Sequence, residues 1–380
     1  MILPIEEYDR NERLALKSTP NRAIQAFSPV TFAWLNYPQR VYEELELARY
    51  VDTMHEAKEA VYFSDTHSYS LDEARLIGEI SDTVAKLTLD RFGKSIRPWM
   101  APLASIPLLR ILCAISQATG KKSLTVFEAG PGSGYLGALL FKAGHRYISM
   151  DNTQAFYLWQ NRLFHELAGK DFHEMAGSQT GSPVDHEKRA VHVPWWVYTT
   201  FHQHCPIQAD VVVCEQALGE ISLLGLRYML RISARMLSGS HPGLFIFTSP
   251  GKTHVSSFRE IFLEAEKAGL VPVFAKHFFG LTPKGSSLSR FVRSVNGCIS
   301  WRHRLWEKAI GPISSPRPLR SAETEILHLT KKQLSSYCPS GNPQRLSAYE
   351  FVPIRREESP ADYPFISFIG HAVPHEKAGE

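Results

Sequence analysis

Three glycines at alternate positions stand between an apolar run and a segment with helical spacing, where residues 127–137 read FEAGPGSGYLG. Glycine lets the backbone turn sharply and approach a ligand where a Cβ atom would collide with it. In doubly wound sheets, ligands bind outside the carboxyl ends of the strands, and the turn after the first strand is the usual place. This segment is therefore the first candidate for a ligand site.

Two classes of ligand use such a turn, and the first of them is a dinucleotide. The dinucleotide pattern is Gly-x-Gly-x-x-Gly with an acid about twenty residues on, and its letters are matched by Gly132, Gly134, Gly137 and Asp151. A dinucleotide strand, however, runs straight into its first glycine, whereas Gly130 and Pro131 stand between the apolar run and Gly132. If Gly130 is the first glycine, the third position falls on Tyr135 and the pattern fails.

The second pattern is an acid near the strand end, one small residue, and then Gly-x-Gly-x-Gly. Glu128, Ala129 and the GPGSG of residues 130–134 fit it at every position. The segment resembles the first motif of the class I S-adenosylmethionine-dependent methyltransferases. The resemblance implies that the glycine loop lies under the methionine part of S-adenosyl-L-methionine and that Asp151 binds the ribose hydroxyls. A carboxylate suits that role because it accepts strong, charge-assisted hydrogen bonds from both hydroxyls.

The same resemblance assigns roles to residues that follow the later strands. It implies that the segment Pro194-Trp195-Trp196 lines the adenine and that Cys214-Glu215-Gln216 faces the sulfur and methyl group. Aromatic faces also suit a sulfonium cation, although an aromatic stripe at helical spacing, such as the one from Phe156 to Trp159, is more often plain core. The cofactor-binding residues expected in this way are Glu128, Gly130, Gly132, Gly134, Tyr135, Asp151, Asn152, Trp195, Glu215 and Gln216.

A narrower resemblance covers residues 123–249, about a third of the chain. The run GPGSGYLGALLFKAGHRYISMDNTQAFYLWQNRL is similar to a bacterial family of sugar O-methyltransferases, whose substrate assignments are themselves inferred. This resemblance favours a small metabolite as the methyl acceptor, with a hydroxyl oxygen as the acceptor atom. Carbon or nitrogen methylation of an aromatic or heterocyclic metabolite is the alternative.

Methyl transfer from an activated sulfonium needs alignment of the reactants and exclusion of water more than it needs acid–base help. A hydroxyl acceptor nevertheless gains from a nearby base. Glu220 follows the fourth strand and His254 follows the fifth, so both loops open on the ligand edge, and these two are the candidate catalytic residues. The alternative for each is a solvated residue at the start of a helix, and His192 and His277 lie within strand-like runs.

Other chemistries have little support in the sequence. There is no H-E-x-x-H and no C-x-x-C, so we expect no metal site. There is no G-x-S-x-G elbow, which argues against a hydrolase. A basic segment over residues 290–308 is either a solvated face or a contact for an anionic substrate group.

The elements that must position this loop alternate between strands and helices. Apolar runs such as DVVVC and LFIF suit strands buried on both faces, and the helical segments between them imply a parallel sheet covered on both sides. We expect an α/β, doubly wound (Rossmann-like) methyltransferase sheet in residues 106–300. Residues 1–105 are expected to form a helical N-terminal cap that serves as a lid or a dimerisation region. Residues 301–380 form a C-terminal extension of uncertain structure, with one expected strand at Phe365 to Ile369.

Bulk composition agrees with a globular enzyme. The 380 residues are 44% hydrophobic and 21% charged, and the formal net charge of +4 gives no support for a nucleic-acid partner. Five scattered cysteines favour a reducing compartment, and no apolar run reaches the length of a signal peptide or a membrane span. We expect a cytoplasmic protein that acts on a small molecule, either as a monomer or as a homodimer.

Two further functions stay open at this point. An NAD-dependent oxidoreductase would use the dinucleotide match at the glycine loop, and a non-catalytic binding protein would keep the fold without turnover. The intact acid and glycine positions count against loss of donor binding.

Overall fold

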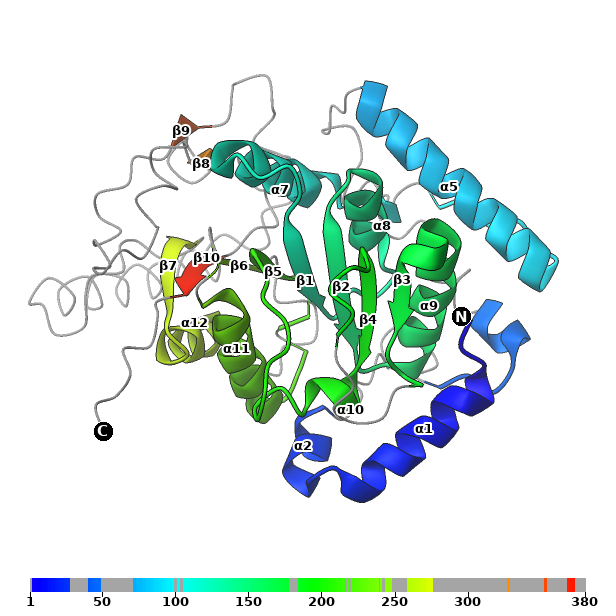
Figure 1. The fold of residues 1–380 in the computed structure, drawn as a ribbon, viewed down its shortest axis with the longest axis horizontal. Coiled ribbons are helices and arrows are strands. Elements are labelled where there is room, and N and C mark those ends of the chain that lie inside the picture. Colours follow the sequence, from blue (N-terminus) through cyan, green and yellow to red (C-terminus); the bar gives the residue numbers. More distant parts are fainter. Residues whose placement is uncertain are drawn as a thin grey trace, which may run out of the picture.

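The computed structural model describes residues 2–27, 40–48, 71–98, 101–102, 105–177, 184–215, 217–218, 220–238, 240, 243–247, 258–275, 327–328, 352–353 and 368–372. Within these residues, none of the helices combines the length and the apolar character that crossing a membrane would require. The described residues form a central sheet with helices on both sides of it (Figure 1).

Eight strands of the described chain form one sheet in the order β3-β4-β2-β1-β5-β6-β10-β7. Their bounds are β1 Thr125–Ala129, β2 Arg146–Asp151, β3 Phe172–Glu174, β4 Ala190–Pro194, β5 Val211–Cys214, β6 Leu244–Phe247, β7 Leu270–Ala275 and β10 Phe368–Ala372. Neighbouring strands pair in parallel except at β10, which is antiparallel to both β6 and β7. A separate two-stranded ladder joins β8 Leu327–His328 to β9 Val352–Pro353.

The chain starts the sheet at its centre and builds outward in both directions, which confirms the expected doubly wound fold. From β1 it passes to β2, then to the edge strand β3, and back to β4 between these two, before it returns to β5 and β6 on the other side. The order therefore reverses between β1 and β5, and ligands of such sheets bind at the carboxyl ends beside this reversal. The glycine loop leaves β1 at this point.

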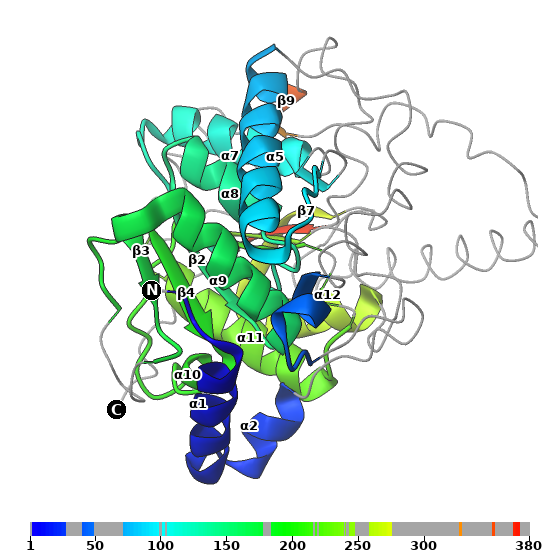
Figure 2. The ribbon, with the colours of Figure 1, turned by 90° about the vertical axis from the view of Figure 1, so that its right-hand side faces the viewer.

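Two layers of helices cover the sheet. Their bounds are α1 Ile5–Ser18, α2 Asn21–Ala26, α5 Leu71–Phe92, α7 Ile106–Thr119, α8 Tyr135–Lys142, α9 Gln154–Ala168, α10 Trp195–Tyr198, α11 Leu223–Leu237 and α12 Phe258–Lys267. Right-handed crossovers in opposite directions put α8 and α9 on one face and α11 on the other. Figure 2 shows α5 crossing outside α8 and α9, and all three are in contact.

The structure departs from the sequence-based expectations at three places. The edge strand β3 was not expected, because three residues of mixed polarity are too short to show a strand pattern. Trp195 was expected within the third strand but begins α10. The expected strand near the C-terminus exists with a shifted span as β10, and it completes the sheet between β6 and β7.

Leu89 was expected on the apolar stripe of α5, but its side chain is 53% exposed. The stripe instead buries Ile77, Ile80, Val84 and Leu87. In the segment of residues 39–61, for which helical spacing predicts a helix, residues 40–43 are not helical and residues 44–48 are. Residues 39 and 49–61 lie outside the described residues.

Candidate functional site

The glycine loop between β1 and α8 has three residues with left-handed backbone angles. Gly130, Gly132 and Gly134 have φ values of 72°, 56° and 76°. Two backbone bonds fix the turn, from Gly130 N to Met150 O at 2.8 Å and from Gly134 N to Pro131 O at 2.9 Å. Residues with a Cβ rarely adopt such angles, so the alternating glycines are what allow this bend.

The surroundings of the three glycines differ. A Cβ at Gly130 would lie 2.9 Å from the Cβ of Ala217, and one at Gly134 would lie 3.1 Å from Phe164. A Cβ at Gly132 would have no neighbour closer than the Phe156 ring, at 3.8 Å. Packing therefore requires Gly130 and Gly134, whereas Gly132 has space over it.

Gly137, which completed the letters of the dinucleotide pattern, has a packing role. A Cβ atom at this position in α8 would collide with the Tyr147 ring of β2. The small residue allows the helix to approach the sheet closely, and this need does not depend on which ligand the loop holds.

Asp151 ends β2 next to the glycine loop and is buried. Its Oδ2 accepts hydrogen bonds from Gly132 N at 3.2 Å and from Gln160 Nε2 at 3.0 Å. Its Oδ1 accepts one from Thr153 N at 2.9 Å. Burial raises the pKa of this carboxyl to about 6, although these three donors and the charge of His192 oppose the rise. Asp151 is thus ionised at neutral pH and directly linked to the loop.

Glu128 lies on β1, one strand away, and is equally buried. Its Oε2 accepts a hydrogen bond from Tyr147 Oη at 2.6 Å. Burial, and next the negative charge of Glu215, raise the pKa of Glu128 to about 8. This carboxyl is therefore largely protonated at neutral pH.

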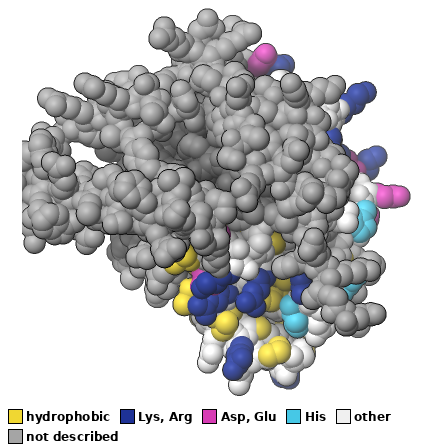
Figure 3. All heavy atoms as spheres, turned by 90° about the vertical axis from the view of Figure 1, so that its left-hand side faces the viewer, with side chains coloured by type: hydrophobic (Ala, Val, Ile, Leu, Met, Phe, Trp, Pro, Cys, Tyr) yellow, Lys and Arg dark blue, Asp and Glu magenta, His cyan; other side chains and the backbone are white. Residues whose placement is uncertain are grey.

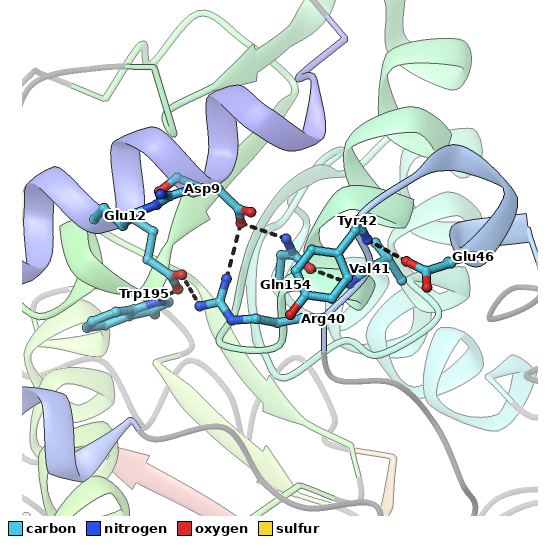
Figure 4. Close-up of polar contacts among 9 residues, drawn as sticks. Asp9, Glu12, Arg40, Val41, Tyr42, Glu46, Gln154 and Trp195 are labelled. Atoms are coloured by element: carbon cyan, nitrogen blue, oxygen red, sulfur yellow. Dashed lines mark hydrogen bonds and ion pairs between the residues drawn. The ribbon is translucent and has the colours of Figure 1, made fainter.

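Helix α1 lies across the carboxyl-end edge of the sheet and is joined to it by a polar cluster (Figure 4). Arg40 pairs with both Asp9 and Glu12 of α1. Asp9 also accepts a hydrogen bond from Gln154 Nε2 at 2.7 Å, and Glu12 accepts one from Trp195 Nε1 at 2.8 Å. The cluster connects α1 to the first residue of α9 and the first residue of α10.

Tyr8 of α1 adds an aromatic contact to this edge. Its ring centroid lies 5.2 Å from that of Tyr157 and 5.1 Å from that of Trp196. The side chain is fully buried and its hydroxyl has no hydrogen-bond partner among the described residues. Burial, followed by the charge of Glu12, raises the pKa of this phenol, and Asp151 contributes to the same shift.

The remaining predicted cofactor residues lie at the same edge with partners of their own. Tyr135 is buried as the first residue of α8, and the Asn152 amide donates to Phe27 O at 3.2 Å. Trp195 is held by α1, as described above. Ser105 Oγ donates to Glu215 Oε2 at 3.4 Å. Gln216 lies outside the described residues.

Of the two predicted catalytic residues, the structure describes one. Glu220 follows β5, with its backbone N donating to Ala217 O at 3.0 Å, and its charge contributes to the raised pKa of Cys214 at the end of that strand. His254 lies outside the described residues. His192 is fully buried and bonded on both ring nitrogens, so it is not placed to act as a base.

Sequence reasoning missed several polar residues that surround Asp151. Gln160 of α9 and Glu174 of β3 both bond to His192 of β4. A polar residue on an apolar helix face was the available signal for Gln160, but its partners lie on distant segments. Within the described residues, no group of three or more His, Cys, Asp or Glu side chains could hold a metal ion.

Basic side chains gather on the face shown in Figure 3, together with hydrophobic ones. Exposed Arg227, Arg231 and Arg235 follow one another at helical spacing on α11, and Arg227 pairs with Glu264 of α12. The basic segment noted at residues 290–308 lies outside the described residues.

Comparison with known proteins gives likenesses in structure only. No family model matches the chain, and no curated protein matches it. A geranyl diphosphate C-methyltransferase from Streptomyces coelicolor A3(2), in complex with Mg²⁺, geranyl-S-thiolodiphosphate and S-adenosyl-L-homocysteine, is 14% identical, with a TM-score of 0.36 over 94% of this chain and 99% of that one.

Two further solved structures resemble smaller parts of the chain. A TehB-like SAM-dependent methyltransferase from Corynebacterium glutamicum is 16% identical, with a TM-score of 0.31 over 49% of this chain and 92% of that one. Magnesium protoporphyrin IX methyltransferase from Synechocystis is 13% identical, with a TM-score of 0.32 over 55% of this chain and 90% of that one. At these scores the fold class rests on the strand order of the chain itself.

Proposed function

We propose that this chain is an S-adenosylmethionine-dependent methyltransferase acting on a small molecule. The observation that carries the proposal is the direct link between the ligand-facing glycine and a buried carboxylate, from Gly132 N to Asp151 Oδ2 at 3.2 Å. A bare backbone bend suits the methionine part of the donor, and an ionised carboxylate one strand over suits its ribose. The motif resemblance assigns the same two roles.

The sheet order supports this reading over dinucleotide binding. The standard dinucleotide-binding sheet has six parallel strands in the order 3-2-1-4-5-6. Here the antiparallel strand β10 lies between β6 and β7, so the second half of the sheet departs from that order.

The contacts of Asp151 refine how it would hold the ribose. A carboxylate offers about four acceptor sites, and among the described residues three are used by Gly132 N, Thr153 N and Gln160. One hydroxyl can therefore bind to Oδ1 without displacing a protein donor. A second hydroxyl bond requires the Gly132 N–H or Gln160 to move away.

The reaction we propose is an in-line displacement that moves the methyl group to the acceptor atom. S-adenosyl-L-methionine supplies the activated methyl group when it is bound. The glycine loop then has to orient the donor, and the chain has to exclude water from the site. We propose that α1, which lies over the strand ends, excludes the water. Residues 1–105 are accordingly proposed as a cap on the donor site rather than as a separate functional unit, although a homodimer contact through them stays open.

For the acceptor, the proposal is a hydroxyl oxygen of a sugar or another hydroxylated metabolite, with Glu220 or His254 removing its proton. Methylation of carbon or nitrogen on an aromatic or heterocyclic metabolite is the alternative. If Glu220→Gln and His254→Asn both leave turnover of an accepted substrate unchanged, the general-base role is wrong and a pre-activated acceptor is favoured.

Calorimetry with S-adenosylhomocysteine and NADH side by side tests the donor assignment. We expect micromolar affinity for S-adenosylhomocysteine and none for NADH. Binding of NADH alone would replace the methyltransferase by the oxidoreductase. Binding of S-adenosylhomocysteine without transfer of a labelled methyl group to any component of a cell extract would favour a non-catalytic binding protein.

A further inference from the structure

A chain of buried hydrogen bonds runs from the glycine loop to the edge of the sheet. Gln160 Nε2 donates to Gly132 O at 2.7 Å and to Asp151 Oδ2 at 3.0 Å. Gln160 Oε1 lies 3.0 Å from His192 Nε2, and His192 Nδ1 lies 2.9 Å from Glu174 Oε2. Gln160 and His192 are fully buried, so these groups have no water to replace a lost partner.

The partners of Gln160 determine how its amide is oriented. Gly132 O and the ionised Asp151 Oδ2 only accept hydrogen bonds, so the NH₂ group of the amide must face them. The amide oxygen then faces His192 Nε2, which must carry a proton. The reverse orientation would place three oxygens together in the interior.

Glu174, at the far end of the chain, is surrounded by donors. Its carboxylate accepts hydrogen bonds from Tyr157 Oη, from Asn161 Nδ2 at 2.8 Å and from Ala176 N at 2.8 Å. Burial would raise the pKa of Glu174, but the charge of His192 and the bonds from His192, Tyr157 and Ala176 outweigh it, and the pKa is lowered. The Glu174 carboxylate thus acts as an acceptor, 2.9 Å from His192 Nδ1.

His192 is therefore held between two acceptors, Gln160 Oε1 and the Glu174 carboxylate. Its ring also stacks on Tyr157, with centroids 3.6 Å apart and an angle of 15° between the planes. Because the amide oxygen of Gln160 can only accept, His192 Nε2 is the donor in this bond. This fixes the Gln160 amide in the one orientation that supports Asp151 and the loop.

We infer that Gln160 is a positioning residue for the methyl donor, and that the His192–Glu174 pair locks it in place. Gln160 orients the Asp151 carboxylate toward the ribose and the Gly132 backbone toward the methionine part of the donor. It does so through its hydrogen bonds to these two residues and does not itself contact the donor. This inference rests on the proposed function, because it gives Gln160 a role only if Asp151 binds the donor.

The inference predicts a change in pH dependence that simple loss of stability would not cause. The charge of His192 from β4 acts on Asp151, and Asp151 in turn adds to the rise that burial causes in the pKa values of Tyr8 from α1, Glu128 from β1 and Tyr147 from β2. The wild-type pKa of about 6 means that donor affinity falls as the pH is lowered through 6. The Gln160 hydrogen bond lowers this pKa, so removing it moves the loss of affinity to a higher pH.

The test compares Gln160→Met with Thr88→Val, a change at a fully buried polar residue of α5. The Thr88 hydroxyl accepts from Ile96 N at 2.9 Å and donates to Val84 O at 2.8 Å, so its loss removes buried hydrogen bonds but spares those of Asp151, Gly132 and Glu174. S-adenosylhomocysteine affinity is measured by calorimetry from pH 5 to 8, with thermal unfolding alongside. Losing a hydrogen bond to a charged group lowers affinity about tenfold to a hundredfold in Gln160→Met. Thr88→Val is expected to stay within about threefold of wild type, with an unchanged pH midpoint.

Equal losses of affinity in the two variants, or an unchanged pH midpoint in Gln160→Met, would overturn the inference. Failure of the wild type to bind S-adenosylhomocysteine would instead reject the proposed function. A second measurement uses the wild type alone and so does not depend on whether a variant folds. It is nitrogen NMR of the labelled histidines at pH 7. It should show a proton on His192 Nε2, and an Nε2 without a proton would contradict the locked orientation of the Gln160 amide.

Discussion

The carboxyl ends of β1 and β2 carry two buried carboxyl groups, Glu128 and Asp151. Their pKa values differ because their hydrogen-bond partners and neighbouring charges differ. Asp151 accepts bonds from three donors, and its pKa rises only to about 6. Glu128 accepts one, from Tyr147, faces the charge of Glu215, and its pKa rises to about 8. With both groups buried, the neighbouring charges and the number of donors decide which of them is charged at neutral pH.

The difference suits the two ends of the proposed donor. The charged Asp151 can accept a hydrogen bond from a neutral hydroxyl, and this bond leaves its ionisation unchanged. The protonated Glu128 is uncharged until a cation comes near, and a sulfonium or ammonium at the site would lower its pKa. The following substitutions test the roles of Asp151 and Glu128, of the glycine loop beside them, and of α1 at the same edge of the sheet.

The largest effect is expected from Gly132→Val, which places a side chain in the open space over the glycine loop. A branched side chain at a φ of 56° strains the loop and occupies the ligand position, so binding of S-adenosylhomocysteine should fall below detection by calorimetry. Gly144→Val is the control, since Gly144 also has a positive φ, of 91°, but has no atoms within 4 Å of an added Cβ. Equal affinity in the two variants would remove the glycine loop from the site.

Glu128→Gln should change the pH dependence of stability. The folded pKa of Glu128 lies above its unfolded value, so its stabilising contribution is complete below about pH 4.5 and is lost as the pH rises through about 8. Glutamine does not titrate and can still accept from Tyr147. Urea unfolding should therefore show similar stabilities at pH 5 and an advantage on the order of 3 kcal/mol for the variant at pH 9. Parallel curves across this range would show that Glu128 is not the buried neutral acid described here.

Asp151→Ala tests the charged side of the comparison. Removing a charged hydrogen-bond partner should weaken binding of S-adenosylhomocysteine by about 1–3 kcal/mol at pH 7.5. The loss should shrink near pH 5, because wild-type Asp151 is then largely protonated as well. Thermal-shift titration of both proteins measures it, and identical ligand-induced shifts at pH 7.5 would refute the role of Asp151.

The smallest effect is expected from Arg40→Ala, which loosens α1 without touching either carboxyl group. The Arg40 side chain is 39% exposed, so its pairs with Asp9 and Glu12 should contribute under about 1 kcal/mol to global stability. Hydrogen exchange in α1 should nevertheless become faster while exchange in β1 and β2 stays unchanged. Arg75→Ala, which breaks an exposed pair with Asp72, is the control and should leave exchange in α1 as it is.

The sequence was sufficient for the parts of the fold that depend on local pattern. The apolar runs located β1, β2, β5 and β6, and the alternating glycines predicted the bend after β1. The antiparallel position of β10 could not be predicted, because nothing in the Phe368–Ala372 segment specifies that it inserts between β6 and β7. Its pairing depends on an edge that exists only once the rest of the sheet has formed.

In the candidate site, too, the sequence predicted what depends on local pattern and not what depends on contacts between distant segments. Asp151 could be recognised from its place after the second strand, but the donors that set its charge could not. Gln160 and His192 are 32 residues apart in the chain and meet only through the packing of α9 on β4. The contact of Trp195 with Glu12 spans 183 residues, so the closure of this edge by α1 also needed the structure.

The most direct test of the central claim is a crystal structure of the wild-type protein with S-adenosylhomocysteine. The account predicts the methionine part of the ligand over Gly132 and a ribose hydroxyl donating to Asp151 Oδ1, with Gln160 still bonded to the carboxylate. A ligand bound away from the carboxyl ends of β1 and β2, or a ribose without contact to Asp151, would contradict it.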